Sequence, residues 1–338
     1  MKVAFYDLEG WEISIIKRRL KGKNFKILTS SKEGFDHTKL KDVKKVEILS
    51  TTSRLDKNLI KALPDLKLIS VRSTGYDNVD IDFCKKKGIA VTNVPVYGEE
   101  TVAEYTFGLI LTLSRKMSMT FLRTLFGMFE RRDLRGMDLS GKTIGVVGTG
   151  RIASRVIKMA HAFEMKILCY DLYPKQELVD KYNAKYVELN RLLSNSDVIT
   201  IHVPYTKDTH HLINEDSIKL IKKGTLLINA ARGAIVDTTA VLRALEDGRL
   251  GGVALDTFEG EEILIGQESV LRKSDEDLPL AVSFKKSIEA TRLLRFRNVV
   301  LTPHNAFNTK EAVKRILNTS LDGIVSFATK DDCECRVV

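Results

Sequence analysis

The sequence predicts an α/β protein built from two doubly wound parallel-sheet domains. Short apolar runs alternate with stretches of helical spacing along almost all of the 338 residues. The runs are nearly continuously apolar, which is typical of parallel strands covered by helices on both faces. They form two series, one before residue 95 and one from residue 143, and 43% hydrophobic residues in a chain of this length suffice for two cores.

The order of the runs predicts how the domains are connected. The first series is KVAFYD, KILTS, VEILST, LKLISV and IAVTNV, and the second is TIGVVG, KILCYD, KYVEL, DVITIHV, TLLINAA, GGVALD and NVVLTP. Residues 98–133 lie between them without an internal proline, and we interpret them as a long connector helix that leaves the first domain and packs into the second. Residues 308–330 are again amphipathic. If this last helix returns to the first domain, the second domain is an insertion.

Composition excludes several classes of protein. Four scattered cysteines do not make a disulfide framework, so we expect a reduced cytoplasm; the C-x-C of Cys333 and Cys335 is assigned no function, and no metal site is predicted. The longest apolar run, residues 102–113, is shorter than the roughly 20 residues that a bilayer crossing needs. The N-terminus has the pattern of a strand rather than of a signal peptide. We therefore expect a cytoplasmic protein with no membrane partner.

The charge is strongly basic, with a formal net charge of +10 and a pI near 9.3. The excess lies in short clusters such as KRRLKGK, KLKDVKK, CKKKG and FERRDLR. They lack interleaved aromatic residues and fall on the expected wet faces of helices, so we interpret them as solvated surface and regard nucleic-acid binding as unlikely. A positive field would still attract a small anionic substrate.

The most specific local pattern is TIGVVGTGRIAS, a strand and a glycine turn that lead into a helix. Gly148 permits the tight turn, Gly150 lets a pyrophosphate approach the backbone, and Ala153 keeps the helix close to the sheet. The next strand ends in Asp171, where a carboxylate would accept hydrogen bonds from both ribose hydroxyls. Its charge repels a 2′-phosphate, so the pattern predicts NAD rather than NADP.

Five segments in this order resemble the D-isomer-specific 2-hydroxyacid dehydrogenases, most closely the D-lactate dehydrogenases: VVGTGRIAS, HVPYTKDTHHLIN, LLINAARGAIVD, GGVALDTFEGEE and NVVLTPHNAF. Residues 66–111 extend the resemblance over nearly the whole chain. It implies a Rossmann NAD-binding domain, residues 101–304, inserted into a flavodoxin-like substrate (catalytic) domain, residues 1–100 and 305–338. It further implies an active site in the cleft between them, usually in a homodimer.

The resemblance also implies three catalytic residues. Arg232, in AARG at the end of a strand, would hold the carboxylate and carbonyl oxygen of a 2-oxo acid with its planar fork of donors. His304, in LTPHNAF, would donate a proton to the developing alkoxide. Glu261 matches the acid that orients this histidine and favours its charged form, although Glu259 and Glu262 compete with it in sequence.

Other positions match the family's ligand contacts. The cofactor contacts implied in this way are Arg151, Ile152, Val203, Pro204, Thr209, Ala230, Ala231 and Asp256. The main-chain amides of Thr74 and Gly75 would receive the substrate carboxylate, and Tyr97 and Phe307 would wall the substrate pocket. Gly98 and Glu99 stand where a serine and a proline are common, and Asn305 replaces the usual residue after the histidine. These departures leave the size of the substrate open.

Together these observations predict an NAD-dependent dehydrogenase that reduces a small 2-oxo acid, with pyruvate favoured, to the D-hydroxy acid. The long segment 259–298 resembles an extension of the lactate-type members. Reduction of glyoxylate or hydroxypyruvate is the near alternative. From a different class, the family includes NAD-sensing transcriptional corepressors, which the basic clusters would suit, but Arg232, Glu261 and His304 favour an enzyme.

Overall fold

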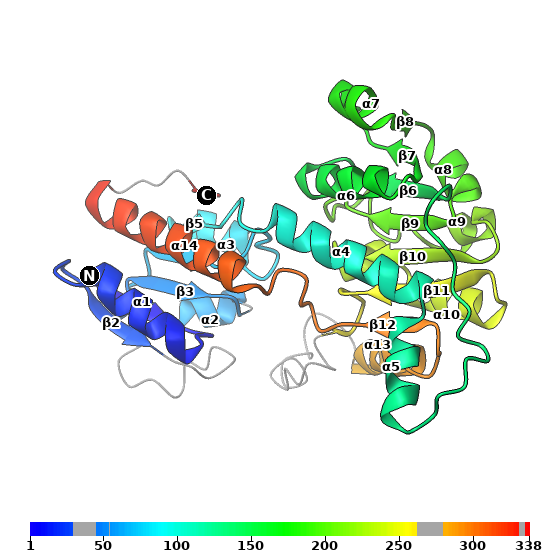
Figure 1. Ribbon diagram of the computed structural model, residues 1–338. Coiled ribbons are helices and arrows are strands. Elements are labelled where there is room, and N and C mark those ends of the chain that lie inside the picture. Colours follow the sequence, from blue (N-terminus) through cyan, green and yellow to red (C-terminus); the bar gives the residue numbers. More distant parts are fainter. Residues whose placement is uncertain (30–44, 54, 262–279, 331–334) are drawn as a thin grey trace. The chain divides into compact units, whose positions relative to one another are not determined.

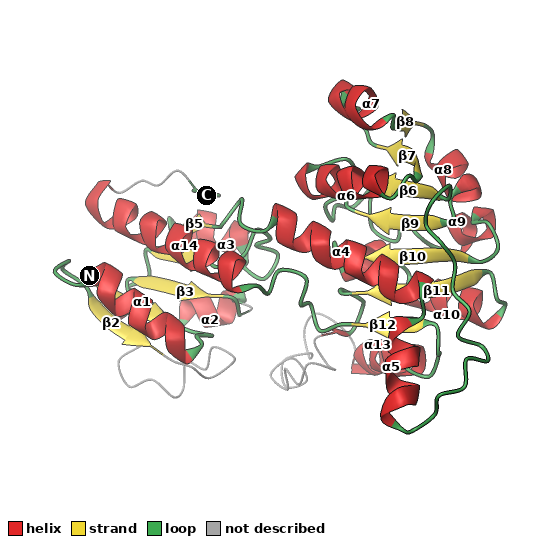
Figure 2. Ribbon diagram, viewed as in Figure 1, coloured by secondary structure: helices red, strands yellow, loops and turns green. Residues whose placement is uncertain are grey.

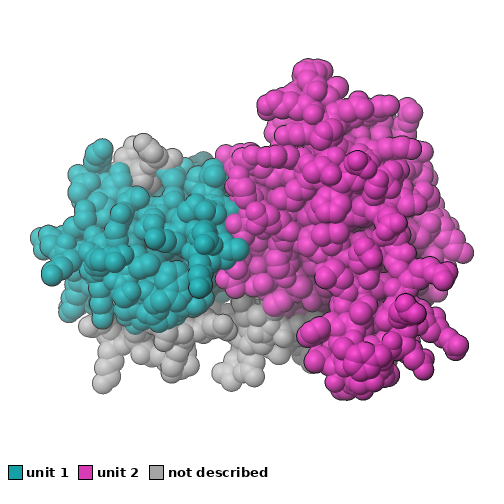
Figure 3. All heavy atoms as spheres, viewed as in Figure 1, with its two compact units in different colours: residues 1–98, 309–338 teal, residues 99–308 magenta. Residues whose placement is uncertain are grey.

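The structure, a computed structural model, describes residues 1–29, 45–53, 55–261, 280–330 and 335–338. These residues form two compact units, Met1–Gly98 with Thr309–Val338 and Glu99–Asn308, which Figure 3 colours separately. Each unit has one parallel sheet with helices, which confirms the α/β class (Figures 1 and 2). No helix in the described ranges is long and apolar enough to cross a membrane. His37, Cys333, Glu262 and the polar segment 266–279 lie outside the described residues.

The first unit contains a five-stranded sheet in the order β2-β1-β3-β4-β5. Its strands are β1 (Lys2–Phe5), β2 (Lys26–Thr29), β3 (Ile48–Thr51), β4 (Leu68–Val71) and β5 (Ala90–Thr92), and its helices are α1 (Gly10–Leu20), α2 (Lys57–Lys61), α3 (Ile81–Lys87) and α14 (Lys310–Lys330). This is the flavodoxin-like order. Helix α14 returns to this sheet because its apolar stripe, including Leu317 and Leu321, packs in one cluster with Phe5 and Leu68.

The second unit contains a seven-stranded sheet in the order β12-β11-β10-β9-β6-β7-β8. Its strands are β6 (Thr143–Val147), β7 (Lys166–Tyr170), β8 (Lys185–Tyr186), β9 (Val198–Ile201), β10 (Thr225–Asn229), β11 (Leu250–Leu255) and β12 (Val299–Leu301). The order reverses between β6 and β9, as in dinucleotide-binding sheets. Successive side chains point to opposite faces, so Val146 and Val147 belong to two different core clusters. Both faces are therefore covered, which explains the continuously apolar runs.

Helices cover the two faces of this sheet. They are α4 (Glu99–Ser114), α6 (Arg151–Ala162), α7 (Gln176–Tyr182), α8 (Leu189–Asn195), α9 (Glu215–Leu220), α10 (Thr238–Glu246) and α13 (Leu280–Leu293), with α5 (Met117–Leu125) following α4. Helix α4 contacts α6, β10 and β11.

The prediction of one long connector helix over residues 98–133 was wrong. Helix α4 ends at Ser114, and α5 begins after Lys116, whose φ of +51° is left-handed. The carbonyl of Ser114 accepts a hydrogen bond from the Met137 amide at 2.8 Å, and a Cβ on Gly136 would lie 2.3 Å from the same oxygen. The segment around Met137 therefore supplies a hydrogen-bond donor to a carbonyl at the end of α4 that has no partner within the helix. This contact spans more than 20 residues and is invisible in the local helical pattern.

Candidate active site

The turn between β6 and α6 has the shape that a pyrophosphate requires. Gly148 has a φ of +88°, and a Cβ on it would lie 2.9 Å from the backbone of His202 and from the Val203 side chain, so only glycine fits. A Cβ on Gly150 would meet no atom within 4 Å. Since Gly150 is also the N-cap of α6, the start of this 12-residue helix presents bare backbone, which suits a phosphate group.

Asp171 lies directly after β7, as the sequence predicted. Its Oδ2 accepts hydrogen bonds from Thr149 N at 2.5 Å and Thr149 Oγ1 at 2.9 Å, and its Oδ1 accepts from Tyr173 N at 2.8 Å. Burial alone would raise the pKa of Asp171, but these hydrogen bonds lower it overall. The carboxylate is therefore negatively charged at neutral pH, as discrimination against a 2′-phosphate requires.

Five of the other predicted cofactor contacts lie at the carboxyl edge of the same sheet. Val203 and Pro204 follow β9, Ala230 and Ala231 follow β10, and Asp256 follows β11. Ligands of open α/β sheets bind along this edge, near the switch point between β6 and β9.

Two further cofactor positions have partners that sequence reasoning did not foresee. The Thr209 hydroxyl donates to the Pro204 carbonyl at 2.7 Å and so shapes the loop after β9. The Nε of Arg151 pairs with a Glu99 carboxylate oxygen at 2.9 Å, which joins the first turns of α6 and α4. No local pattern in the sequence links residues 99 and 151.

Arg232 lies on a short turn after β10. Asn229, which is fully buried, donates through Nδ2 to the carbonyls of Arg232 at 2.9 Å and Thr257 at 3.3 Å. A Cβ on Gly233 would lie 2.5 Å from the carbonyl carbon of Phe258, so the turn is in close contact with the chain after β11. Sequence reasoning missed Asn229, although a buried amide at the end of a strand is the kind of group that must find backbone partners.

The same chain segment brings Glu261 to His304. The Nδ1 of His304 lies 3.3 Å from Oε1 of Glu261, and the other carboxylate oxygen accepts from the Phe258 amide at 3.1 Å. The Glu261 side chain is mostly buried, whereas that of His304 is 44% exposed. The Glu261 carboxylate is therefore held in place beside Nδ1 of the His304 imidazole, and the imidazole itself remains accessible.

The competitor Glu259 has other partners. Its Oε1 lies 2.8 Å from the Nζ of Lys286 and 3.2 Å from the Nε2 of His211. Burial alone would raise the pKa of Glu259, but the bond from Lys286 and the nearby His211 lower it overall. Of the two glutamates described in this turn, Glu261 is thus the one that faces His304.

The buried carboxylate of Asp256 holds the loop that carries His304. It accepts hydrogen bonds from Thr302 Oγ1 at 2.6 Å, the Asn305 amide at 2.8 Å and the Ala306 amide at 2.9 Å. His304 itself has a left-handed φ of +51°. This geometry gives Asp256 a positioning role, which the sequence did not indicate, and its contact with a nicotinamide stays a prediction.

A second histidine near this edge differs from His304. Burial lowers the pKa of His202 to about 4, and its Nε2 lies 2.9 Å from the Thr200 hydroxyl. His202 is therefore neutral at pH 7 and carries no proton to donate as an imidazolium.

In the first unit, Thr74 and Gly75 lie on the loop after β4. The Asn93 side chain donates to the Thr74 carbonyl at 2.7 Å, and the Ser73 hydroxyl donates to the Gly75 carbonyl at 2.6 Å. These bonds use the carbonyls of the loop and so fix the direction of its peptide groups.

The two residues predicted to wall the substrate pocket fall in different units. Tyr97 belongs to the first unit, where its carbonyl accepts a hydrogen bond from Arg315. Phe307 belongs to the second unit, where its ring lies edge-on to the ring of His304, with the two ring centroids 6.3 Å apart.

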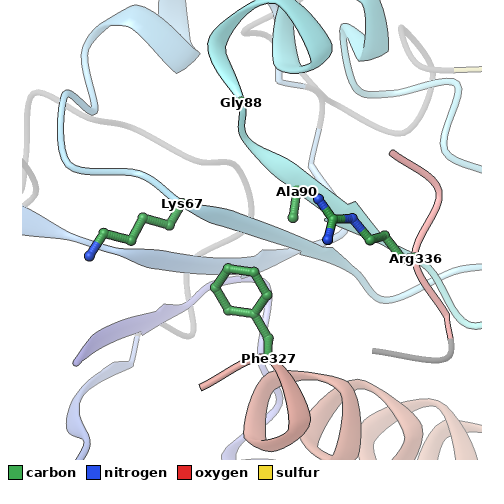
Figure 4. Close-up of a pocket in the computed structure, with 5 residues that line it drawn as sticks. All are labelled: Lys67, Gly88, Ala90, Phe327 and Arg336. Carbon is green, nitrogen blue, oxygen red and sulfur yellow. The ribbon is translucent and has the colours of Figure 1, made fainter. Parts of the chain in front are cut away.

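A small pocket of the first unit lies elsewhere. Figure 4 shows its lining residues, Lys67, Gly88, Ala90, Phe327 and Arg336. Lys67 and Gly88 precede β4 and β5, so the pocket lies at the amino ends of these strands. Ligands of such sheets bind at the opposite, carboxyl ends, and none of the predicted site residues lines this pocket.

The second unit is a dinucleotide-binding domain of the Rossmann type, because it combines the strand order of its sheet, the glycine turn after β6 and the acid after β7. Residues 107–306 match the family model described as D-isomer specific 2-hydroxyacid dehydrogenase, NAD binding domain. The chain belongs to this family of NAD-dependent dehydrogenases. NAD is accordingly its cofactor, and Gly148, Gly150 and Asp171 form a site of suitable shape and charge for it.

Individual relatives match most of the chain. The 2-hydroxyacid dehydrogenase homolog 1 of Schizosaccharomyces pombe is 34% identical over 98% of both chains. A glyoxylate reductase of Thermococcus litoralis is 36% identical over 86% of this chain and 82% of its own length. The crystal structure of D-lactate dehydrogenase from Aquifex aeolicus, complexed with NAD and lactic acid, is 38% identical, covers 97% of this chain and 96% of its own, and superposes with a TM-score of 0.83.

Proposed function

We propose that this protein reduces a small 2-oxo acid, with pyruvate as the favoured substrate, to the D-2-hydroxy acid with NADH. The observation that carries the proposal is the 3.3 Å contact between Nδ1 of His304 and Oε1 of Glu261. A histidine whose Nδ1 faces a carboxylate is oriented to use Nε2 for proton transfer. The likeness to a D-lactate dehydrogenase that binds lactic acid supports pyruvate as the substrate.

Each catalytic residue has one task in this proposal. NADH, when bound, supplies the hydride for C2 of the 2-oxo acid. The Arg232 guanidinium binds the carboxylate and the carbonyl oxygen and stabilises the charge that develops on that oxygen. The Nε2 of His304 gives its proton to the oxygen, and the Glu261 carboxylate orients the ring through Nδ1. The reverse reaction returns the proton to the same nitrogen.

The first unit is the proposed substrate domain. The amides of Thr74 and Gly75 would donate to the substrate carboxylate, and their carbonyls are already engaged by Asn93 and Ser73. A loop whose carbonyls are held in this way keeps its amide directions, which is the preorganisation that anion binding requires.

Reduction of glyoxylate is the second candidate. It is supported by the glyoxylate reductase of Thermococcus litoralis, which matches 86% of this chain. The two candidates share the same residues and differ only in the size of the group at C2 of the substrate.

A panel of 2-oxo acids with NADH, followed by NADH absorbance, tests the proposal and ranks the substrates. We expect pyruvate to give the highest kcat/KM and the product to have the D configuration. If no acid is turned over and the protein binds duplex DNA tightly in a gel shift at physiological salt, the protein is a binding protein and not an enzyme.

We also propose a homodimer through α5 and the residues that follow it. Seven large apolar side chains here are between 51% and 77% exposed, and we call them the α5 patch: Met117, Phe121, Leu122, Leu125, Phe126, Met128 and Phe129. No residue of this nine-residue helix is buried, and so short a helix is marginal by itself in water. The adjacent residues 130–133, Glu-Arg-Arg-Asp, carry both signs of charge, which suits a second copy of the same patch across a two-fold axis.

A further inference from the structure

A chain of hydrogen bonds from Lys175 through Tyr186 and Thr149, which we call the relay, runs through the predicted coenzyme-binding edge and ends on Asp171. The Lys175 amide donates to the Tyr186 hydroxyl at 2.9 Å, and Tyr186 donates to Oγ1 of Thr149 at 3.0 Å. Thr149 in turn donates to Oδ2 of Asp171 at 2.9 Å. The chain joins β8, the glycine turn and the end of β7, none of which are neighbours in sequence.

The direction of every proton in this chain is determined by its two ends. A backbone amide can only donate, and an ionised carboxylate can only accept. The Tyr186 hydroxyl therefore accepts from Lys175 and gives its own proton to Thr149, and the Thr149 proton must point to Asp171. Hydroxyls aligned in one direction polarise each other, so the last bond, to the carboxylate, is strengthened.

Counting acceptor positions shows what is left for a ligand. A carboxylate has about four lone-pair positions, two on each oxygen. Oδ2 of Asp171 already has two donors, the amide and the hydroxyl of Thr149, and Oδ1 has one, the Tyr173 amide. One position remains, on Oδ1. The expectation that Asp171 accepts from both ribose hydroxyls therefore exceeds the capacity that this hydrogen-bonded carboxylate retains.

Thr149 has little freedom to take up another arrangement. It is fully buried and lies between Gly148 and Gly150. The Tyr186 ring lies partly buried beside the Asp171–Lys175 loop, which is held at Tyr173 by Asp171 and at Lys175 by Tyr186.

We propose that Thr149 and Tyr186 are positioning residues for the coenzyme. Their hydroxyls hold the Asp171 carboxylate so that one acceptor position on Oδ1 serves the ribose and the charge cannot turn away from a 2′-phosphate. This inference rests on the role assigned to Asp171 under the proposed function. It makes Thr149 and Tyr186 determinants of the preference for NAD over NADP.

Fluorescence titration with NADH and with NADPH, in the absence of any 2-oxo acid, tests the inference without depending on the substrate. We expect Tyr186→Phe and Thr149→Val each to raise the Kd for NADH about 3- to 10-fold, the size of one net hydrogen bond. The Kd for NADPH should stay the same or fall, because the carboxylate that repels the 2′-phosphate is then held less firmly, so the preference for NADH over NADPH narrows. Thr149→Ser, which keeps the hydroxyl, should restore NADH binding.

Two further variants separate this inference from its premise. In an Asp171→Ala background, Thr149→Val should have no additional effect on NADH binding, because the hydroxyl then has no carboxylate to hold. Tyr182→Phe removes a hydroxyl from α7 in the same unit, outside the relay, and should leave both Kd values unchanged.

The possible results divide clearly. If Asp171→Ala weakens NADH binding but Thr149→Val and Tyr186→Phe leave it within about twofold, the relay is overturned and the role of Asp171 stands. If Asp171→Ala itself has no effect, the role of Asp171 and the relay both fail. Should Thr149→Val not fold, Tyr186→Phe, which removes a single oxygen atom, decides the question.

Discussion

The amide of His304 donates a 2.9 Å hydrogen bond to the carbonyl of Asp256, whose carboxylate holds the next two amides of the same loop. Asp256 is 1% exposed, so this anchor lies within the protein, while the His304 ring stays accessible. The position of the proposed proton donor is thus set by a residue 48 positions earlier in the chain.

Asp256→Asn should loosen this loop. The new amide group would have to face a backbone N–H, leaving a buried donor unpaired at a cost of about 1–3 kcal/mol. We expect faster hydrogen exchange at Asn305 and Ala306 and a fall in kcat of about 10- to 100-fold, roughly 1.4 kcal/mol for each factor of ten. Thr302→Val removes only the 2.6 Å hydroxyl bond and should have a smaller effect on both. Unchanged exchange in Asp256→Asn would refute the anchoring role.

The contact between Nδ1 of His304 and Oε1 of Glu261 predicts that this carboxylate orients the imidazole. Glu261→Gln keeps the size of the side chain but removes the charge, so we expect kcat for pyruvate reduction to fall by about 10- to 100-fold, a part of what a positioned acid contributes. Glu259→Gln is the matched control, because Glu259 pairs with Lys286, and it should leave kcat within about twofold of wild type. A loss of activity in Glu259→Gln alone would mean that Glu259, and not Glu261, supports His304.

Removal of the imidazole should abolish most of the activity. We expect His304→Gln to lower kcat by roughly 10² to 10⁴-fold, the usual contribution of a positioned acid. NADH binding, measured by fluorescence, should be retained. A variant with nearly full activity would make His304 an ordinary loop residue.

Arg232→Lys keeps the positive charge but loses the planar fork of donors. We expect kcat/KM for pyruvate to fall by about two to four orders of magnitude, with an unchanged melting temperature. Arg243→Lys, on the exposed face of α10, is a control that alters an arginine of the same unit paired to Glu215. Near-normal pyruvate reduction by Arg232→Lys would show that another group binds the carboxylate.

Asp7 predicts a loss of stability in acid. Burial alone would raise its pKa, but hydrogen bonds from Thr51, Thr52 and Ser53 and the charge of Arg72 lower it overall. A lowered pKa in the folded state stabilises the protein above the unfolded value of 3.8 and is lost as the pH falls through the folded value. Near pH 7, Asp7→Asn should therefore lower the free energy of unfolding by about 1–3 kcal/mol.

The fluorescence of Trp11, the single tryptophan, reports on this unit during urea unfolding. The difference between wild type and Asp7→Asn should shrink as the pH is lowered below about 4. A difference that is equally large in acid would mean that the charge of Asp7 does not contribute.

The α5 patch predicts the oligomeric state. Phe126→Glu with Phe129→Glu places charges on the two most exposed apolar residues of the patch, each 77% exposed. We expect light scattering to show a dimer for wild type and a monomer for this variant, because a charge buried in an apolar interface is costly. Leu294→Glu, at an exposed leucine outside the patch, should remain dimeric. A monomeric wild type would exclude the proposal.

The sequence by itself determined the α/β class, the apolar runs that form the strands of both sheets, the glycine turn at Gly148 and Gly150 and the acid after β7. These features are local: an apolar run of one period, a glycine that must adopt positive φ, or a charged residue that ends a strand. It also pointed to Glu261 and His304, but only through a family pattern, since Glu259 has the same chemistry two residues away.

Only the tertiary structure decided which groups meet. It broke the helix at Lys116, because Met137 returns to the carbonyl of Ser114. It directed Glu259 to Lys286 and Glu261 to His304, and it filled three of the four acceptor positions of Asp171. Except for the bond from the Tyr173 amide to Asp171, these hydrogen bonds join residues more than 20 positions apart. They form when strands and helices pack, and they leave no periodic trace in the chain.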